Sequence, residues 1–325
     1  MSAPLENLPE LRLGSAGKEF LIQTVLTVGL FLSITLVPLV GFFSGLLTPA
    51  PTVIAIIRWG VPNALLVPGC SALLGSLILY LLNLSDSIPY LVALIGMGAL
   101  MGFGIRSGWS TQKTVGLASL FIIGVAGLFL ILALTESKGE LVQLIEQDMR
   151  GGISAAMEQL GSSSIETKEL ESKLLETVPL IVGILPGMFI SCTVGMCWLN
   201  LLISRRYCHT AAGVPCVAEK LALWKSPEFF VWFVIAGGLM LILPEDDLKL
   251  AGLNLIIVVG TAYFLQGLAI VSFYFERWKL PFFVKGFVLA ILFLQQFASM
   301  ATAVLGLFDV WFDFRKLAKK PELDR

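Results

Sequence analysis

The chain has 325 residues, of which 57% are hydrophobic and only 14% are charged, and its net charge is −1. A soluble domain carries about 25% charged residues, so this composition excludes a soluble globule, and the small net charge gives no indication of nucleic-acid binding. With a mean hydropathy of +0.88, we predict an all-α, polytopic bundle of transmembrane helices that lies in the lipid bilayer.

The N-terminal segment is polar and precedes the first hydrophobic run. Residues 1–19 contain five charged side chains and lack the basic start, short apolar core and small-residue cleavage site of a signal peptide. We interpret residues 1–19 as a cytoplasmic segment. Phe20–Val40 is the first predicted span, because about 20 residues are enough to cross the hydrocarbon layer.

The next run, Gly41–Leu82, has two interpretations. Pro49 and Pro62 interrupt it, and Arg58 lies between them. The run is either one long broken helix or two passes, a short proline-interrupted one ending near Arg58 and a full one from Pro62. Because non-helical backbone at membrane depth must be shielded by protein or line a cavity, the prolines favour an interior position.

Two more spans, Ile88–Ile105 and Val115–Leu134, complete an N-terminal group of transmembrane helices within residues 20–135. Gly98 and Gly102 lie four residues apart in the first of these spans. This spacing of small residues lets another helix approach closely.

The C-terminal group of transmembrane helices occupies residues 177–312, and residues 313–325 form a basic tail. The group adds four predicted spans, which brings the total to eight or nine. These spans are Val178–Ile203, Phe229–Leu243, Leu250–Phe275 and Val284–Phe312.

Between the two groups lies Glu136–Glu176, a polar insert with 13 charged residues, nine of them acidic. Apolar residues over Leu141–Leu160 recur at helical spacing, which predicts an amphipathic helix. Ser163 and Glu166 have the form of a capping box, which predicts a second helix leading into the next span. We interpret residues 136–176 as a solvated extracytoplasmic connector in preference to a binding lid.

The distribution of basic residues is used to orient the helices. If Gly41–Leu82 makes two passes and the N-terminus is cytoplasmic, most basic short loops lie inside and the acidic insert lies outside, but the basic tail then lies outside as well. The one-pass interpretation places the tail inside and reverses most short loops. Counting therefore leaves two possibilities, nine passes or eight passes plus a C-terminal segment on the membrane surface.

A polar stripe follows the last predicted helix at alternating spacings of four and three residues, so its members share one helical face. A carboxylate in or near hydrocarbon is costly unless it is paired or faces water, so this face is expected to point into the bundle or a cavity. The stripe consists of Gln295, Ser299, Thr302, Gly306, Asp309, Asp313, Lys316 and Lys320.

Further interior polar residues are predicted in other runs, namely Arg58, Asn200, Asn254 and Gln266. In one interpretation these residues and the stripe line the path of a solute or ion. In the other, the amides and hydroxyls hold helices together through hydrogen bonds, and Asp309 and Asp313 pair with Arg315 or Lys316.

Signatures of soluble enzymes are missing from the sequence. It has no phosphate-binding glycine loop, no paired-His zinc motif on a helix and no nucleophile elbow, so we expect neither enzyme activity nor a cofactor. Five cysteines and a single histidine do not show the paired spacings of a structural zinc site, and no metal site is expected.

Several segments resemble a known family: "NLIIVVGTAYFLQGLAIVSFYF" (Asn254–Phe275), "LGLFDVWFDFRKL" (Leu305–Leu317), "LLTPAPTVIAIIRWG" (Leu46–Gly60) and "GMGALMGFGIR" (Gly96–Arg106). Over nearly its whole length the chain resembles the YybS-like family of bacterial membrane proteins, whose function is unassigned. That family is similar in fold to the substrate-binding S components of energy-coupling-factor vitamin transporters, six-helix bundles with both termini cytoplasmic. The resemblance implies an S-component-like N-terminal bundle, to which this chain adds three C-terminal spans.

These features together lead us to expect small-solute transport or substrate capture in the bacterial plasma (inner) membrane. The expected partners are an unknown small solute and a second membrane protein. The alternative is a non-transporting scaffold or assembly partner in the cell envelope. A transporter should contain polar, water-accessible volume at mid-membrane, whereas a scaffold should fill that volume with Leu and Phe.

Overall fold

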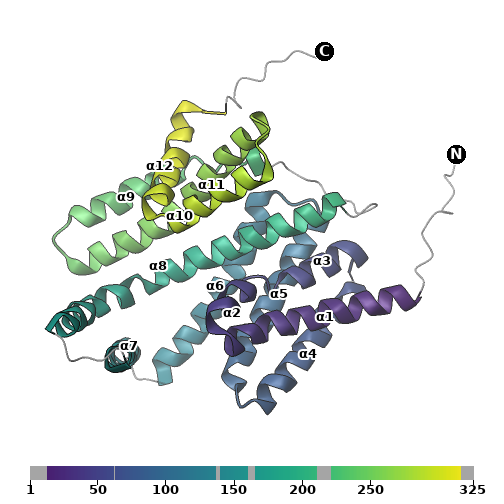
Figure 1. The fold of residues 1–325 in the computed structure, drawn as a ribbon, viewed down its shortest axis with the longest axis horizontal. Coiled ribbons are helices and arrows are strands. Elements are labelled where there is room, and N and C mark those ends of the chain that lie inside the picture. Colours follow the sequence, from purple (N-terminus) through teal and green to yellow (C-terminus); the bar gives the residue numbers. More distant parts are fainter. Residues whose placement is uncertain (1–12, 62, 137–139, 160–164, 211–220, 316–325) are drawn as a thin grey trace. The chain divides into compact units, whose positions relative to one another are not determined.

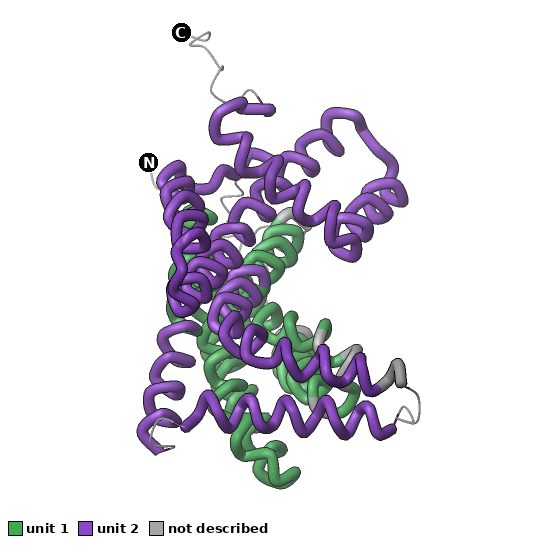
Figure 2. Tube along the Cα trace, turned by 90° about the vertical axis from the view of Figure 1, so that its left-hand side faces the viewer, with its two compact units in different colours: residues 1–122, 196–218 green, residues 123–195, 219–325 purple. Residues whose placement is uncertain are grey.

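The computed structural model describes residues 13–61, 63–136, 140–159, 165–210 and 221–315. Within these ranges the chain is helical and has no strand, which confirms the all-α prediction (Figure 1). Its contacts divide the chain into two units (Figure 2). Unit 1 comprises residues 1–122 and 196–218, and unit 2 comprises residues 123–195 and 219–325.

The described part of unit 1 consists of helices joined by short turns, with 3-10 turns at Asn63–Leu65 and Ser85–Ser87. Its helices are α1 (Leu13–Leu36), α2 (Pro38–Gly45), α3 (Ala50–Trp59), α4 (Leu66–Leu81), α5 (Ile88–Arg106), the first part of α6 (Thr111–Glu136) and the last part of α8 (Ile165–Thr210). The run Gly41–Leu82 is thus not a single helix. It contains a short helix after Pro49 and a longer one after Pro62, which agrees with the predicted interruption of the run by prolines.

The short helix α3 lies in the core of unit 1, with seven of its ten residues buried. Pro51 lies in its first turn, where a backbone N–H would have no intrahelical partner, so the missing N–H of proline costs no hydrogen bond. Helix α5 packs directly on α3 because Gly98 and Gly102 have no side chains. A Cβ built on Gly98 would lie 2.7 Å from the carbonyl oxygen of Pro49, and one on Gly102 would lie 2.8 Å from Ile56 Cβ. The close approach predicted from this glycine pair is confirmed.

Unit 2 is organised around its long helix α10, against which α9 and α12 pack. Its described elements are the last part of α6, α7 (Leu141–Gln159), the first part of α8, a 3-10 turn at Leu221–Leu223, α9 (Phe230–Ile242), α10 (Asp246–Arg277), α11 (Phe282–Leu294) and α12 (Gln296–Phe312). Helices α10 and α12 cross at Gly267 and Gly306, where a Cβ on Gly306 would collide with the backbone oxygen of Tyr263. Only glycine permits this backbone-to-backbone contact.

The polar insert forms α7 and the start of α8. The predicted amphipathic helix is confirmed as α7, whereas Ser163 of the predicted capping box lies outside the described residues. The second predicted helix is confirmed as the start of α8, which continues for 46 residues in total. Arg150 Nη1 donates to the carbonyl of Leu175 at 3.1 Å, and Ser154 Oγ donates to Glu171 at 2.9 Å, so α7 is hydrogen-bonded to α8.

In the described part of the chain, six helices are long and apolar enough to cross a membrane: α1, α4 with its preceding turn, α5 with its preceding turn, α6, α8 and α10. The pair α11–α12 meets the same test only if taken as one span. The apolar segments Phe43–Trp59 and Phe230–Ile242 are shorter. The chain is therefore a multi-pass membrane protein by length and composition.

The predicted span Val284–Phe312 is not one continuous helix, because α11 and α12 meet at an angle of 98°. The break falls at Gln295, whose φ of −97° and ψ of 112° are extended. The hydroxyl of Ser299 donates to the carbonyl of Leu292 at 2.5 Å and so satisfies a group that an unbroken helix would bond to a backbone N–H. Neither proline nor glycine marks this break in the sequence.

Both ends of the α11–α12 pair lie at the C-terminal end of α10. Helix α11 begins five residues after Arg277, and the hydroxyl of Tyr274 donates to the carbonyl of Phe314 at 3.1 Å. Helix α12 crosses α10, with Thr302 against Gly267, Gly306 against Tyr263, and the side chain of Asp309 bonded to Gln266. The 98° bend therefore turns α12 across α10.

Candidate functional site

The predicted polar stripe of the last helix is buried only along α12. Thr302, Gly306 and Asp309 are buried where α12 packs on α10. Gln295 is exposed at the bend, and Ser299 is half-buried. Lys316 and Lys320 lie outside the described residues.

Asp309 forms a fully buried ion pair with Arg315. Arg315 Nη2 lies 2.7 Å from Asp309 Oδ2, and both side chains have 0% exposure. Gln266 Nε2 donates to the same oxygen at 3.1 Å, and the backbone N–H of Phe314 donates to Oδ1 at 2.9 Å. The carboxylate is therefore paired and hydrogen-bonded, which is the condition for retaining a charge in such a position.

The same network binds the segment that precedes α9. Arg315 Nη1 donates to the carbonyl oxygens of Ala222 at 2.7 Å and Trp224 at 2.9 Å. Gln266 Oε1 accepts bonds from the backbone N–H of Ser226 at 3.1 Å and from its hydroxyl. We call Ser226, Gln266, Asp309 and Arg315 the C-terminal lock, because together they tie the end of α12 to α10 and to this segment.

The lock agrees with the helix-holding interpretation of the stripe. Asp313 ends α12 in a left-handed conformation (φ 43°) and pairs with Lys225 at 2.9 Å in a partly exposed position. Every lock carboxylate and amide oxygen has a donor, whereas Arg315 Nε has no hydrogen-bond partner among the described residues. From the sequence, Arg315 was predicted only as a potential partner of Asp309. Ser226 was not predicted, because an isolated serine is common in loops.

Asn254 joins α10 to α8 within unit 2. Its Nδ2 donates to the carbonyls of Gly183 and Leu250, both at 2.8 Å, and its Oδ1 accepts from the N–H of Gly187 at 2.5 Å. In an uninterrupted α-helix the Gly183 carbonyl and the Gly187 N–H would bond each other. Asn254 therefore inserts into the hydrogen-bond ladder of α8, and its amide is fully used in holding the two helices together.

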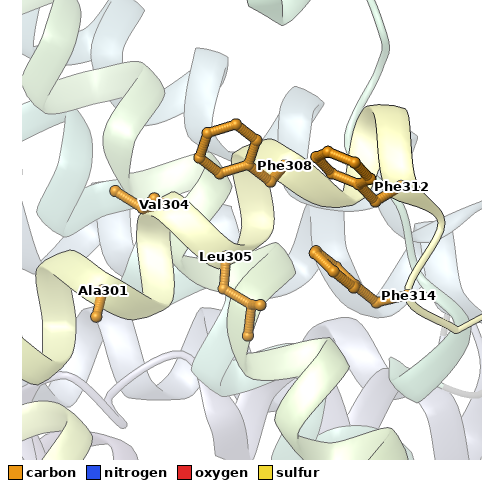
Figure 3. A pocket seen from close by; sticks show the side chains of 6 residues that line it. All are labelled: Ala301, Val304, Leu305, Phe308, Phe312 and Phe314. Atoms are coloured by element: carbon orange, nitrogen blue, oxygen red, sulfur yellow. The ribbon is translucent and has the colours of Figure 1, made fainter.

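The outer side of α12 carries a groove of about 500 Å³. It is lined by Ala301, Val304, Leu305, Phe308, Phe312 and Phe314 (Figure 3). The rings of Phe312 and Phe314 stack with their centroids 5.8 Å apart. A groove lined only by apolar side chains offers nothing to a polar solute and suits the acyl chains of the bilayer.

Asn200 occupies a different position, in the interior of unit 1. Its side chain is buried, with 0% of the residue exposed. Nδ2 uses both of its hydrogens, donating to the carbonyls of Leu46 and Met196 at 2.8 Å each. The oxygen Oδ1 has no hydrogen-bond partner among the described residues. Asn200 thus differs from Asn254 in that its side-chain oxygen accepts no hydrogen bond from the described residues.

Several buried hydroxyls of unit 1 share this lack of a partner within the described ranges. Thr52 has 0% exposure, and its Oγ1 makes no hydrogen bond. Thr27 is equally buried, but its Oγ1 donates to the carbonyl of Gln23, four residues earlier, at 2.9 Å. That local bond is the usual one for a threonine in a membrane helix. The group without it comprises Thr24, Thr48, Thr52, Ser71 and Ser119, of which Ser119 has the thiol of Cys197 beside its hydroxyl.

Arg58 was predicted among the interior polar residues, and the structure instead places it at an exposed end of unit 1. Its Nη1 pairs with Glu19 at 2.9 Å, where 41% of the arginine side chain is exposed. The same nitrogen donates to the hydroxyl of Tyr207 at 3.1 Å. The start of α1, the end of α3 and the end of α8 therefore meet at one end of the unit.

Other helix ends meet at the same place. Arg106 Nη1 donates to the carbonyl of Ile57 at 2.9 Å, and Arg205 Nη2 donates to Thr111 Oγ1 at 2.7 Å. Gly60, with a φ of 71°, ends α3 beneath the guanidinium of Arg106, where a Cβ would lie 2.8 Å from it. We call this end of unit 1 the basic collar: Arg58, Arg106, Lys113, Arg205 and Arg206.

Three of the residues with unpartnered oxygens lie at a similar distance from the basic collar along their helices. Thr52, Ser119 and Asn200 are five or six residues from Arg58, Lys113 and Arg205 along their helices. At 1.5 Å per residue this distance is about 8–9 Å. We call the set the polar layer: Thr24, Thr48, Thr52, Ser71, Ser119 and Asn200.

Contacts between helices bring the centre of the polar layer together. Asn200 is bonded to the backbone at Leu46, two residues before Thr48, in the turn that opens α3. One turn earlier on α8, Cys197 Sγ lies 3.4 Å from Met97 Sδ on α5. The neighbouring Gly98 faces Thr52, since a Cβ built there would lie 3.1 Å from Thr52 Cβ. Helix α5 therefore contacts both α3 and α8 in this region, and Asn200 is bonded to the turn that precedes α3.

Comparison with known families adds an independent result. The family model described as "Predicted membrane protein (DUF2232)" matches residues 25–310, which is most of the chain.

The chain belongs to the DUF2232 family.

The DUF2232 match covers both units and confirms that the chain is a membrane protein. No curated protein matches the chain, and no solved structure does. The basic collar, the polar layer and the C-terminal lock are therefore features read from this DUF2232 chain itself. Of these, the polar layer was missed by sequence reasoning except for Asn200, because a threonine that bonds locally and one that does not look the same in the sequence.

Proposed function

We propose that the chain captures or transports a small polar solute, and that the polar layer of unit 1 is its binding site. The supporting observation is the set of buried side-chain oxygens in unit 1, Asn200 Oδ1 among them, that have no partner among the described residues. A buried polar group without a partner costs about 1–3 kcal/mol, and hydrocarbon offers no water to relieve it. A bound solute would supply the missing partners.

The C-terminal lock supports the alternative function, that of a scaffold or assembly partner, for unit 2 alone. Its buried ion pair and the fully used amide of Asn254 hold helices together, as a scaffold or an assembly partner requires. We propose that unit 2 is the structural module, which contacts a membrane-protein partner, and that unit 1 binds the solute. No enzyme activity is part of this proposal.

We further propose a topology of eight passes plus a re-entrant α11–α12 pair. Helices α2 and α3 together form one broken pass, and α9 forms a short one. The start of α11 and Phe314 both lie at the C-terminal end of α10, and we therefore assign the basic tail to the same side of the membrane as that end, which the number of passes makes cytoplasmic. With the collar in the cytoplasm, 17 of the 22 Lys and Arg residues are inside, and the acidic insert is outside.

This topology is the basis for the finer assignments. We propose that the protein lies in a bacterial inner membrane, and that unit 1 is S-component-like, as the resemblance to the YybS-like family implies. Six passes then end at the basic collar, with both of their ends cytoplasmic. Any active transport requires a partner or an ion gradient.

Mass spectrometry of solutes that co-purify with the protein tests the proposal. The protein is isolated gently in detergent, denatured, and its small-molecule extract is compared between wild type, Asn200→Leu and Asn254→Leu. We expect a solute enriched in wild type and in Asn254→Leu, and lost from Asn200→Leu. Thr52→Val, which removes a single unpartnered hydroxyl, should fold and also lose the solute. Equal extracts from wild type and Thr52→Val would contradict the proposal.

A further inference from the structure

We infer that the solute is a small uncharged molecule that carries a hydrogen-bond donor next to an acceptor, as an amide does. This inference rests on the proposed capture function and concerns the chemical class of the solute. It follows from the kinds of polar atom in the polar layer, and from the charges that the layer lacks.

The donor on the solute is required by Asn200. Both hydrogens of its amide nitrogen are already bonded to the carbonyls of Leu46 and Met196. What remains is Oδ1, which can only accept. A ligand group facing Asn200 must therefore donate an N–H or O–H, and a carboxylate or other pure acceptor leaves this oxygen unpaired.

The acceptor on the solute is required by the start of α3. The hydroxyls of Thr48 and Thr52 can each donate a hydrogen bond, and the partial positive charge at the start of a helix favours an acceptor there. The turn that opens α3 is bonded to Asn200, and the two hydroxyls beside it, Thr48 and Thr52, are fully buried and lack partners in the described structure. A carbonyl oxygen on the solute would accept bonds from these groups while its N–H reaches Asn200 Oδ1.

The polar layer disfavours both anionic and cationic solutes. It consists of Thr, Ser and Asn side chains, and the charged side chains of the basic collar, such as Arg58 and Arg205, lie five or six residues away along the helices. A buried ion without a counter-charge is strongly disfavoured in a membrane interior. The start of α3 also repels a cation.

Melting of the purified, ligand-free protein in detergent tests the chemical class. The probes are acetamide, acetate and ethylamine, which have similar size and differ in charge. We expect acetamide to raise Tm by about 2–4 °C near ten times its Kd, and the two ions to leave Tm unchanged. Thr52→Val should abolish the acetamide shift. Thr27→Val is the matched control, equally buried but locally bonded, and should keep it.

The possible failures are distinguishable. A shift with acetate or ethylamine that Thr52→Val abolishes would overturn the uncharged class and leave capture standing. Absence of any shift with acetamide in wild type would overturn the amide-like class, while the co-purification experiment decides capture separately. A shift with acetamide that persists in Thr52→Val would place binding elsewhere and overturn the inference.

Discussion

Removing one partner of the Asp309–Arg315 pair should destabilise unit 2 severely. Both side chains have 0% exposure, so Asp309→Leu leaves the guanidinium of Arg315 buried without its counter-charge. Breaking a buried pair in this way costs about 3–5 kcal/mol. For a chain of this size each kcal/mol lowers Tm by roughly 2–4 °C, so we expect a fall of about 6–20 °C. Asp309→Asn keeps the shape and some hydrogen bonds and should cost less.

The double variant Asp309→Leu/Arg315→Leu separates the charge effect from the loss of packing. Replacing both partners by apolar residues is often neutral, so it should recover most of the lost Tm. Asp313→Asn is the exposed control and should cost about 1 kcal/mol or less. Leu294→Val, at a side chain that is 86% exposed, should change nothing. Melting in detergent measures all of these, and wild-type stability of Asp309→Leu would refute the argument.

The remaining predictions concern packing and topology. Gly306→Val should prevent α12 from packing on α10 and lower Tm by about 10 °C. Gly260→Val is the control, because the space around its Cβ position is open, and it should have a small effect. Equal melting temperatures of the two variants would contradict the crossing of α10 and α12 at Gly306. A fluorescent protein fused to the C-terminus should fold and fluoresce in the cytoplasm, and alkaline phosphatase fused there should be inactive; the reverse pattern would exclude the re-entrant pair. In a cysteine-free background, Gln147→Cys in α7 should react with a membrane-impermeant reagent in intact cells, and protection of this site would invert the topology.

The sequence predicted the features that depend on periodicity and composition. The all-α class, the helices of the polar insert and the close packing at Gly98 and Gly102 follow from spacings that are visible in the chain. The stripe correctly marked one face over Thr302–Asp309, because that part is a continuous helix.

The features that were missed depend on tertiary contacts. Nothing in the sequence marks the bend at Gln295, because the freed carbonyl is satisfied by a serine that helices also contain. Arg58 was assigned to the interior because the position of its helix end was not known. Thr27 and Thr52 differ only in whether the hydroxyl finds a local carbonyl, which depends on the packing around each of them.

The stability of ligand-free Thr52→Val relative to Thr27→Val tests the central claim most directly, because the claim is that the polar layer contains oxygens left without protein partners. Valine has the shape of threonine without the hydroxyl. Removing an unpaired buried hydroxyl should stabilise the protein by about 1 kcal/mol or more, whereas removing a bonded one should cost about 1 kcal/mol. The account predicts a higher Tm for Thr52→Val and a lower Tm for Thr27→Val. A Tm that falls equally in both variants would show that Thr52 has a partner within the protein and would contradict the account.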